Sequence, residues 1–230
     1  MAESLGLRVC LAVLAAGESR RMGVCKLSMP VGGTTLLGRA LSAACDSQAD
    51  EVVVVTGCHR DELAGIVSYA ARRLVRELHN DRWEQGQGTS VALAAGHAQG
   101  HGFDALLVMV ADQPFVSSKH LDALIERFYR AREWDAEQEG ANVKRPAPAA
   151  WRASCRGRRG NPCLFDRTCF EALMRLEGDE GARALFRARP DLVVEGVEFD
   201  DPRLFEDIDT PQDLERLDRP CAAGVRDGGR

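Results

Sequence analysis

The chain has 230 residues, of which 45% are hydrophobic and 28% charged, and its formal net charge is −5. A chain of this length can bury the core of one domain, and its acidic balance argues against a general nucleic-acid binder, which needs a basic surface. No apolar run approaches the roughly 18 residues of a membrane span, and the N-terminus lacks the pattern of a signal peptide. We therefore expect a cytoplasmic protein with no membrane or nucleic-acid partner.

The apolar run Val9–Leu14 predicts a short buried strand, and the segment after it has the composition of a phosphate-binding loop. Ala15-Ala16-Gly17 allows the backbone to approach a ligand, so that its N–H groups can point at phosphate oxygens. Arg20, Arg21 and Lys26 follow, and these cations can neutralise a triphosphate. The segment has neither the Walker pattern nor the Gly-x-Gly-x-x-Gly dinucleotide fingerprint. The alternative is a tight strand-to-helix turn with solvated arginines.

Apolar periodicity predicts that strands and helices alternate along much of the chain. The expected strands are Val9–Leu14, Glu51–Thr56, Leu74–Leu78, Ala105–Ala111 and Leu192–Phe199. The expected helices are Thr34–Cys45 (capped by Thr34 or Thr35), a second one with Leu63, Ile66, Val67 and Ala70 on one face, Thr89–Ala98 (capped by Thr89 or Ser90), and Ser117–Arg132. The alternation predicts a Rossmann-like α/β fold, with a mostly parallel sheet and helices on both faces. Ligands of such sheets lie beyond the carboxyl ends of the strands.

The segment Trp134–Gly160 interrupts this rhythm because it is polar, contains proline and becomes increasingly basic. It is interpreted either as a mobile surface excursion or as a basic flap over an anionic substrate. Gly160–Phe165 is expected to return the chain to the sheet, two short helices to follow, and a last helix to begin with Pro211. We expect a single domain over residues 1–218 and a disordered tail over residues 219–230.

Two carboxylates from distant parts of the chain are candidates for a metal site. Asp112 ends a predicted strand before Gln113-Pro114, and Asp209 lies in Asp207-Ile208-Asp209-Thr210-Pro211. Magnesium usually takes one or two carboxylates together with phosphate oxygens and water. Taken singly, Asp112 is also typical of a turn and Asp209 of a helix cap. Together with a phosphate loop they predict a Mg²⁺ site, and the role of Asp207 there is left open.

The motifs, taken together and in order, resemble those of the molybdenum cofactor cytidylyltransferase family, within the wider molybdopterin-guanylyltransferase-like nucleotidyltransferases. The resemblance spans residues 9 to about 218. Its motifs are Leu14-Ala15-Ala16-Gly17-x-Ser19-x-Arg21-Met22-Gly23 with Lys26, Gly86–Ser90, Ala111-Asp112-Gln113-Pro114, Arg159-Gly160-Asn161-Pro162, Gly178-Asp179-x-Gly181-Ala182-Arg183, and Asp207-Ile208-Asp209-Thr210-Pro211.

The resemblance implies a nucleotidyltransferase domain that joins CMP from CTP to the phosphate of molybdenum-molybdopterin and releases pyrophosphate. It implies catalytic roles for Lys26, Arg21 and Asp112, with Asp112 and Asp209 as Mg²⁺ ligands. The implied nucleotide-binding residues are Leu14, Ala15, Ala16, Gly17, Arg21, Lys26, Gly88 and Ser90, of which Gly88 and Ser90 approach the base or the pterin. The basic stretch ending at Arg159, Gly160 and Asn161 is implied for the pterin side.

The nucleotide base is predicted from one methyl group. Within the resemblance, Leu-Ala-Ala-Gly is similar to the cytidine-using branch and Leu-Ala-Gly-Gly to the guanine-using branch, so Ala16 favours CTP. Three alternatives stay open: a transferase that uses GTP, one that acts on a sugar phosphate, and an accessory protein that carries the finished cofactor to a molybdenum hydroxylase. An apo molybdenum hydroxylase is a further expected partner, since direct transfer would protect an oxidation-sensitive product.

The cysteines and histidines are given ordinary structural roles. The eight cysteines include no Cys-x-x-Cys pair, and no disulfide framework is expected. The five histidines are scattered, and none pairs with a cysteine or carboxylate at the spacing of a nucleophile. Cys25 lies beside Lys26, but no step of the implied chemistry needs a thiol.

Overall fold

A computed structural model of the chain describes residues 6–71, 75–137 and 147–218. The segment 219–230, for which a disordered tail is predicted, lies outside the described residues. Among the residues described, no helix has both the length and the apolar content that crossing a membrane would require.

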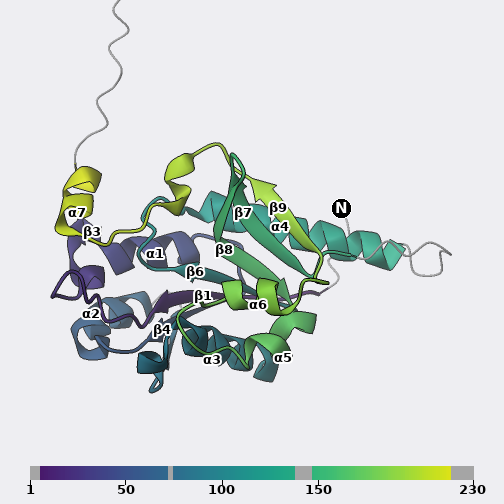
Figure 1. The fold of residues 1–230 in the computed structure, drawn as a ribbon, viewed down its shortest axis with the longest axis horizontal. Helices are drawn as coiled ribbons and strands as arrows, with labels where there is room; N and C mark the ends of the chain where they lie inside the picture. Colours follow the sequence, from purple (N-terminus) through teal and green to yellow (C-terminus); the bar gives the residue numbers. More distant parts are fainter. Residues whose placement is uncertain (1–5, 72–74, 138–146, 219–230) are drawn as a thin grey trace, which may run out of the picture.

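A seven-stranded mixed sheet forms the centre of the molecule (Figure 1). In spatial order its strands are β5 (Val75–His79), β4 (Glu51–Thr56), β1 (Val9–Ala15), β6 (Ala105–Val110), β8 (Arg158–Asp166), β7 (Ala150–Cys155) and β9 (Val194–Glu198). The strands from β5 to β6 are parallel, β8 is antiparallel to β6 and β7, and β9 is parallel to β7. The prediction of a mostly parallel α/β sheet is confirmed.

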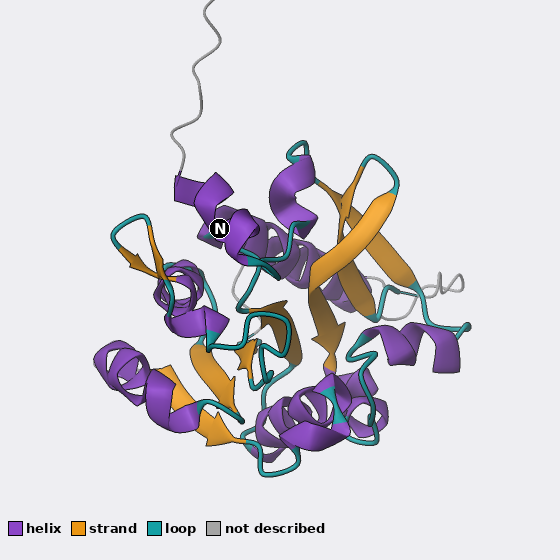
Figure 2. Cartoon of the chain, turned by 60° about the vertical axis from the view of Figure 1, so that its left-hand side comes forward, coloured by secondary structure: helices purple, strands orange, loops and turns teal. Residues whose placement is uncertain are grey.

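Helices cover both faces of the sheet, as the alternating pattern predicts (Figure 2). The α-helices are α1 (Leu36–Cys45), α2 (Arg60–Ala71), α3 (Gln87–Gly100), α4 (Ser118–Glu137), α5 (Phe170–Leu173), α6 (Arg183–Ala188) and α7 (Pro211–Asp218). The short elements are the 3₁₀ turns η1 (Lys26–Ser28), η2 (Trp83–Gln85), η3 (Arg167–Cys169) and η4 (Pro202–Phe205), and the hairpin β2 (Pro30–Val31) with β3 (Thr34–Thr35).

The core has two layers because successive side chains of a strand point to opposite faces. Leu11 and Val13 of β1 pack with residues of α1, α2 and α4, whereas Cys10 and Ala12 pack with residues of α3 and α5. All seven residues of β1 are buried, as in a strand covered on both faces. The carboxyl end of β1 is therefore fixed by packing on both faces, and the loop that follows it starts at the carboxyl edge of the sheet.

The starts of two helices, α1 and α3, differ from the predicted ones. Helix α1 begins at Leu36, and Thr35 rather than Thr34 is its cap, with its hydroxyl accepting from the Gly38 N–H at 3.0 Å. Helix α3 begins two residues earlier than expected, at Gln87, with no side-chain cap. Thr89 and Ser90 are not caps because they lie within the first turn of the helix, where their hydroxyls accept from the buried Asn80 amide at 2.9 Å each.

The interpretation of residues 134–160 as a surface excursion or flap is wrong in its described parts. Helix α4 runs on to Glu137, and residues 150–160 form β7 and the start of β8. Trp151 is fully buried and stacks edge-on against Phe128 of α4. The polar composition of this segment was misleading, because β7 is a mostly buried strand of the sheet and its Trp151 packs against α4. Residues 138–146 lie outside the described part.

Candidate active site

A cavity of about 410 Å³ opens at the carboxyl ends of β1 and β6. Its wall comes from the loop after β1, from the start of α3, and from segments that follow β6 and precede α7. Nine of the residues predicted for the nucleotide and metal sites line it, namely Leu14, Ala15, Ala16, Gly17, Arg21, Lys26, Ser90, Asp112 and Asp209. The fold thus gathers residues from four separate parts of the sequence into one space.

Lys26 lies at the centre of the polar side chains in this cavity. Its Nζ donates to Asp112 Oδ2 at 2.7 Å, to Asp209 Oδ1 at 3.0 Å and to the Ile208 carbonyl at 2.7 Å. Burial by itself would lower the pKa of Lys26, but the charges and hydrogen bonds of Asp112 and Asp209 outweigh it and raise that pKa. Lys26 is therefore charged at neutral pH and holds the two carboxylates together.

Asp209 is available to Lys26 because its neighbours cap the next helix. The Thr210 hydroxyl accepts from the Asp213 N–H at 3.3 Å, and the Asp213 carboxylate accepts from the Thr210 N–H at 2.9 Å. This reciprocal arrangement is a capping box at the start of α7, with Pro211 at the first helical position. Asp209 precedes the box, and its Oδ2 accepts from Arg21 at 2.9 Å. The alternative that Asp209 is itself the helix cap does not apply.

Backbone and buried contacts bring the segment before α7 to the end of β6. The Ile208 N–H donates to the Asp112 carbonyl at 3.0 Å, and the Ile208 side chain is buried. Asp207 accepts from the Gln113 side-chain amide at 2.8 Å. Burial, followed by the charge of Asp112, raises the pKa of Asp207. Asp207 therefore lies behind the carboxylate pair and is absent from the residues that line the cavity.

The loop after β1 is held in an extended path around the cavity. Ser19 adopts a left-handed backbone with φ of 55°, and its hydroxyl accepts from the Lys26 N–H at 3.3 Å. Such a conformation is unfavourable for a residue other than glycine unless its surroundings hold it. The hydrogen bond fixes the two ends of the turn, so that Arg21 and Lys26 both face the same space.

Gly88 packs within the protein rather than lining the cavity. Its N–H donates to the Gly178 carbonyl at 2.8 Å, and the Gly178 N–H donates to the Gln85 carbonyl at 2.9 Å. A Cβ on Gly88 would lie 2.7 Å from backbone atoms of Glu177. This close approach of the two backbones explains why position 88 is a glycine. It also brings Asp179, the residue after Gly178, to the cavity wall.

The residues predicted for the pterin side lie outside this cavity but on the same edge of the sheet. Because β8 is antiparallel to β6, with Cys163 opposite Val108, residues Arg159–Asn161 lie near the carboxyl end of β6. Gly160 is buried beside the Phe205 ring, where a Cβ would lie 2.5 Å from a ring carbon. Arg159 is exposed.

Several cavity residues were missed from the sequence. Trp83, Glu84, Gln87 and Asp179 line the wall opposite the β1 loop. Asp179 lies in the Gly178-Asp179-x-Gly181 motif, so a signal was present, but nothing local indicated that this motif meets the start of α3. The contact depends on the packing of two glycines that are far apart in sequence.

The donor set fits a hard divalent cation. Asp112 and Asp209 supply carboxylate oxygens, the ligands that Mg²⁺ prefers, and both side chains face the cavity, with 25% and 42% of their surface exposed. Lys26 holds the two carboxylates near each other, because its Nζ donates to both. These two residues would hold the metal, and a triphosphate beside it would meet Lys26 and Arg21.

A model of the MobA-like NTP transferase domain matches residues 11–193. The chain belongs to the MobA-like NTP transferase family. Purine catabolism protein PucB of Bacillus subtilis (strain 168) is 32% identical over 90% of this chain and 94% of its own. Nicotine blue oxidoreductase of Paenarthrobacter nicotinovorans is 29% identical, over 89% of this chain and 94% of its own. Relatives of similar length thus carry names of different kinds.

Solved structures of similar proteins have the same fold as this MobA-like NTP transferase. Rv0371c from Mycobacterium tuberculosis H37Rv superposes with a TM-score of 0.74, at 24% identity, over 92% of this chain and 97% of that one. A second structure of Rv0371c is described as a complex with manganese and has a TM-score of 0.64, at 23% identity, over 92% of this chain and 98% of that one.

Proposed function

We propose that this MobA-like NTP transferase transfers CMP from CTP to the phosphate of molybdenum-molybdopterin, giving molybdopterin cytosine dinucleotide and pyrophosphate. The observation that carries the proposal is the convergence of Asp112 and Asp209 on the Nζ of Lys26, at 2.7 and 3.0 Å, in a cavity at the end of β1. Two carboxylates and a buried ammonium beside a loop of small residues suit a metal-bound triphosphate.

The reaction needs positioning and charge neutralisation more than covalent help from the protein. An oxygen of the acceptor phosphate attacks the α-phosphorus of CTP, a new P–O bond forms, and the bond to pyrophosphate breaks. Lys26 and Arg21 neutralise the charge that develops on the leaving pyrophosphate. The Ala15–Gly17 backbone lies close enough to the cavity to donate N–H groups to phosphate oxygens.

A divalent metal on Asp112 and Asp209 would add charge neutralisation at the phosphates. The manganese complex of Rv0371c, a protein of the same fold, supports a divalent ion here. Mg²⁺ is the proposed ion, because oxygen ligands and phosphate are its usual partners.

The acceptor is proposed to enter along the edge formed by the start of β8. Arg159 is exposed there, and Arg158 lies over the Phe205 ring at 5.7 Å from its centroid. These cations lie on the edge of the sheet where β6 ends, so a second phosphate monoester would approach the triphosphate from that side.

The deciding experiment is pyrophosphate release by the full chain with Mg²⁺ and molybdenum-loaded molybdopterin, with CTP and GTP offered separately. Release that needs CTP, pterin and Mg²⁺ together is the expected result. Release with GTP instead would keep the transferase and overturn the choice of base. Release with a sugar phosphate in place of the pterin would overturn the acceptor.

If the protein binds the pterin but releases no pyrophosphate with either nucleotide, the proposed transferase activity would be wrong and a cofactor carrier would be favoured. In that case binding to an apo molybdenum hydroxylase, without nucleotide turnover, would be the activity to measure. The proposal as stated expects that hydroxylase to accept the product directly.

A further inference from the structure

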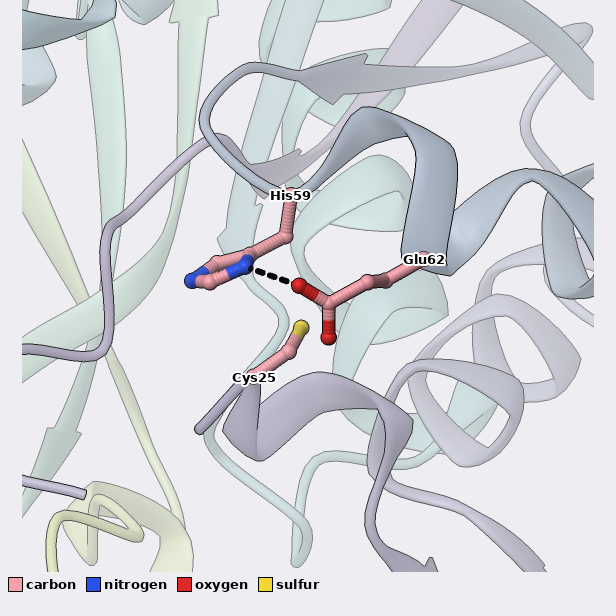
Figure 3. Close-up of side chains that lie close together, drawn as sticks. All are labelled: Cys25, His59 and Glu62. Atoms are coloured by element: carbon pink, nitrogen blue, oxygen red, sulfur yellow. Dashed lines mark hydrogen bonds and ion pairs between the residues drawn. The ribbon is translucent and has the colours of Figure 1, made fainter. Parts of the chain in front are cut away.

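A second cluster of metal-binding side chains lies behind the β1 loop, outside the lining of the cavity. Cys25, His59 and Glu62 each offer one ligand atom, and these three atoms lie within 4.8 Å of one another. Figure 3 shows the three side chains pointing toward one another: Cys25 comes from just before η1, His59 from the turn just before α2, and Glu62 from the first turn of α2.

The hydrogen bonds of His59 leave one ring nitrogen facing the cluster. Its Nε2 lies 2.9 Å from the Glu18 carbonyl, which can only accept, so Nε2 carries a hydrogen. Its Nδ1 lies 2.8 Å from Glu62 Oε1, and an ionised carboxylate also only accepts. Two acceptors cannot share a 2.8 Å contact, so a proton on Nδ1 joins them here. A tetrahedral metal ion that takes both atoms as ligands would replace that proton and hold the two atoms about 3.3 Å apart.

The arrangement of His59 is the one that metal-binding histidines adopt. A histidine ligand almost always donates its other ring N–H to a carboxylate or a backbone carbonyl, which fixes the tautomer and the ring orientation. The Glu18 carbonyl plays that part here. The loop after β1 therefore orients the ring so that its other nitrogen, Nδ1, faces Glu62.

Cys25 adds a thiol that the proposed transfer reaction does not use. It is a free cysteine with 2% of its surface exposed. Sulfur, imidazole nitrogen and carboxylate oxygen together are the ligands of a borderline ion such as Zn²⁺, whereas Mg²⁺ prefers oxygen alone. The donor set differs in kind from the Asp112 and Asp209 pair.

We propose that Cys25, His59 and Glu62 form a Zn²⁺ site that ties the β1 loop to the start of α2. Three protein ligands leave a fourth tetrahedral position, and water can fill it because the Glu62 side chain is 57% exposed. Cys25 directly precedes Lys26, and Glu18 lines the cavity. The ion therefore positions the loop that carries the cavity cations, and it takes no part in the transfer itself.

The test is a Co²⁺ titration of the full chain after treatment with a chelator. Cobalt reports a thiolate ligand by a charge-transfer band in the near ultraviolet and reports tetrahedral geometry by its visible bands. Both are expected to saturate at one equivalent and to vanish when Zn²⁺ is added. Millimolar Mg²⁺ is expected to leave them unchanged, because it does not displace a metal from a thiolate.

Variants assign the ligands. Cys25→Ser is expected to lose the charge-transfer band, and His59→Gln and Glu62→Gln to weaken Zn²⁺ binding by at least about tenfold. The matched controls Cys45→Ser and His101→Gln, which change residues of the same types elsewhere, are expected to bind as the parent does. Glu62 is more than half exposed, so Glu62→Gln is expected to fold even if Cys25→Ser does not.

Two results would overturn the proposal. One is the absence of a cobalt band with thiolate character in the parent protein. The other is Zn²⁺ binding by Glu62→Gln and His59→Gln that matches the parent, which would place the bound metal elsewhere. Either result would leave His59 as an imidazolium paired with Glu62 beside an unligated thiol.

Discussion

At the scale of single residues, the site depends on Lys26 and its two carboxylate partners. The Lys26 side chain is only 13% exposed, so the Lys26 charge is stabilised mainly by Asp112 and Asp209 rather than by water. Replacing one of these carboxylates removes a candidate metal ligand and one of the two negative charges that stabilise the Lys26 ammonium. The first two predictions concern residues in contact with this cavity.

Asp112→Asn is expected to lower turnover by at least about a hundredfold, because one preorganised charged group at a reacting phosphate is worth that much or more. The amide keeps the shape of the side chain, and the variant is expected to fold. Initial rates of pyrophosphate release measure the effect, and Asp81→Asn, at a carboxylate that is 90% exposed, is the control. Turnover of Asp112→Asn close to that of the parent would contradict the assignment of Asp112 as a metal ligand.

Ala16→Gly is expected to relax the preference for CTP over GTP. Ala16 lines the cavity, and the proposed choice of CTP depends on its methyl group excluding the larger purine. Steric discrimination by a group of this size is worth about 1–3 kcal/mol, so the CTP-to-GTP ratio of kcat/KM should fall by about tenfold or more. An unchanged ratio, measured with both nucleotides under the same conditions, would show that another residue selects the base.

At the scale of elements, the start of α3 is held by a backbone ladder to the loop before α6. The bonds between Gly88 and Gly178 and between Gly178 and Gln85 place Gln87 and Asp179 side by side in the cavity wall. The resemblance predicts that Gly88 approaches the base or the pterin. The structure places Gly88 against backbone atoms of Glu177, beside the wall rather than in it.

Gly88→Ala is expected to destabilise the protein by about 1–3 kcal/mol, because the added methyl group must displace backbone that cannot move freely. It should also raise the KM for nucleotide as Gln87 and Asp179 shift. Urea unfolding and steady-state kinetics measure the two effects. Gly96→Ala in the same helix is the matched control, since its Cβ would meet only the Met174 sulfur at an ordinary 3.7 Å. Equal behaviour of the two variants would contradict the packing role.

At the scale of the whole molecule, one face of the sheet buries three thiols. Cys10, Cys163 and Cys169 all lie in the core layer beneath α3 and α5. Burial raises the pKa of Cys10 and of Cys163 to about 12. Burial and then the charge of Asp166 raise the pKa of Cys169 to about 11. In the unfolded chain these thiols return to an ordinary value near 9.0.

Stability is therefore expected to fall on the alkaline side. The folded protein binds more protons than the unfolded chain between pH 9 and the raised values, so the stabilisation is complete below about pH 9 and is lost progressively above it. Each thiol contributes a slope of up to about 1.4 kcal/mol per pH unit. Urea unfolding near pH 8 and near pH 10, with reductant present, measures the fall. The free energy of unfolding of Cys163→Ala should fall less between these pH values than that of the parent. An equal fall would show that other titratable groups cause the loss of stability.

Local patterns in the sequence were sufficient for most of the fold. The apolar runs that became β1, β4 and β6 are long enough to be recognised as buried strands, and their ends place the β1 loop and Asp112 at one edge. The prediction that Gly160–Phe165 returns to the sheet agrees with β8, and the one large error was the segment before it, which forms β7 and the start of β8. Most residues of β7 and β8 are buried, Trp151 and Phe165 among them, but arginines and a turn interrupt the apolar pattern, so neither periodicity nor polarity revealed the hairpin.

By itself, the sequence determined the α/β class and located the loop after β1 and the carboxylates Asp112 and Asp209 as candidate site residues, because each of these features depends on residues close together in the chain. Only the tertiary structure decided which of them meet. Lys26 bonds Asp209 across 183 positions, and Cys25 joins His59 and Glu62 through the packing of the β1 loop on α2. Contacts of this kind arise when the sheet orders its strands and the helices cover its faces, and no local pattern encodes them.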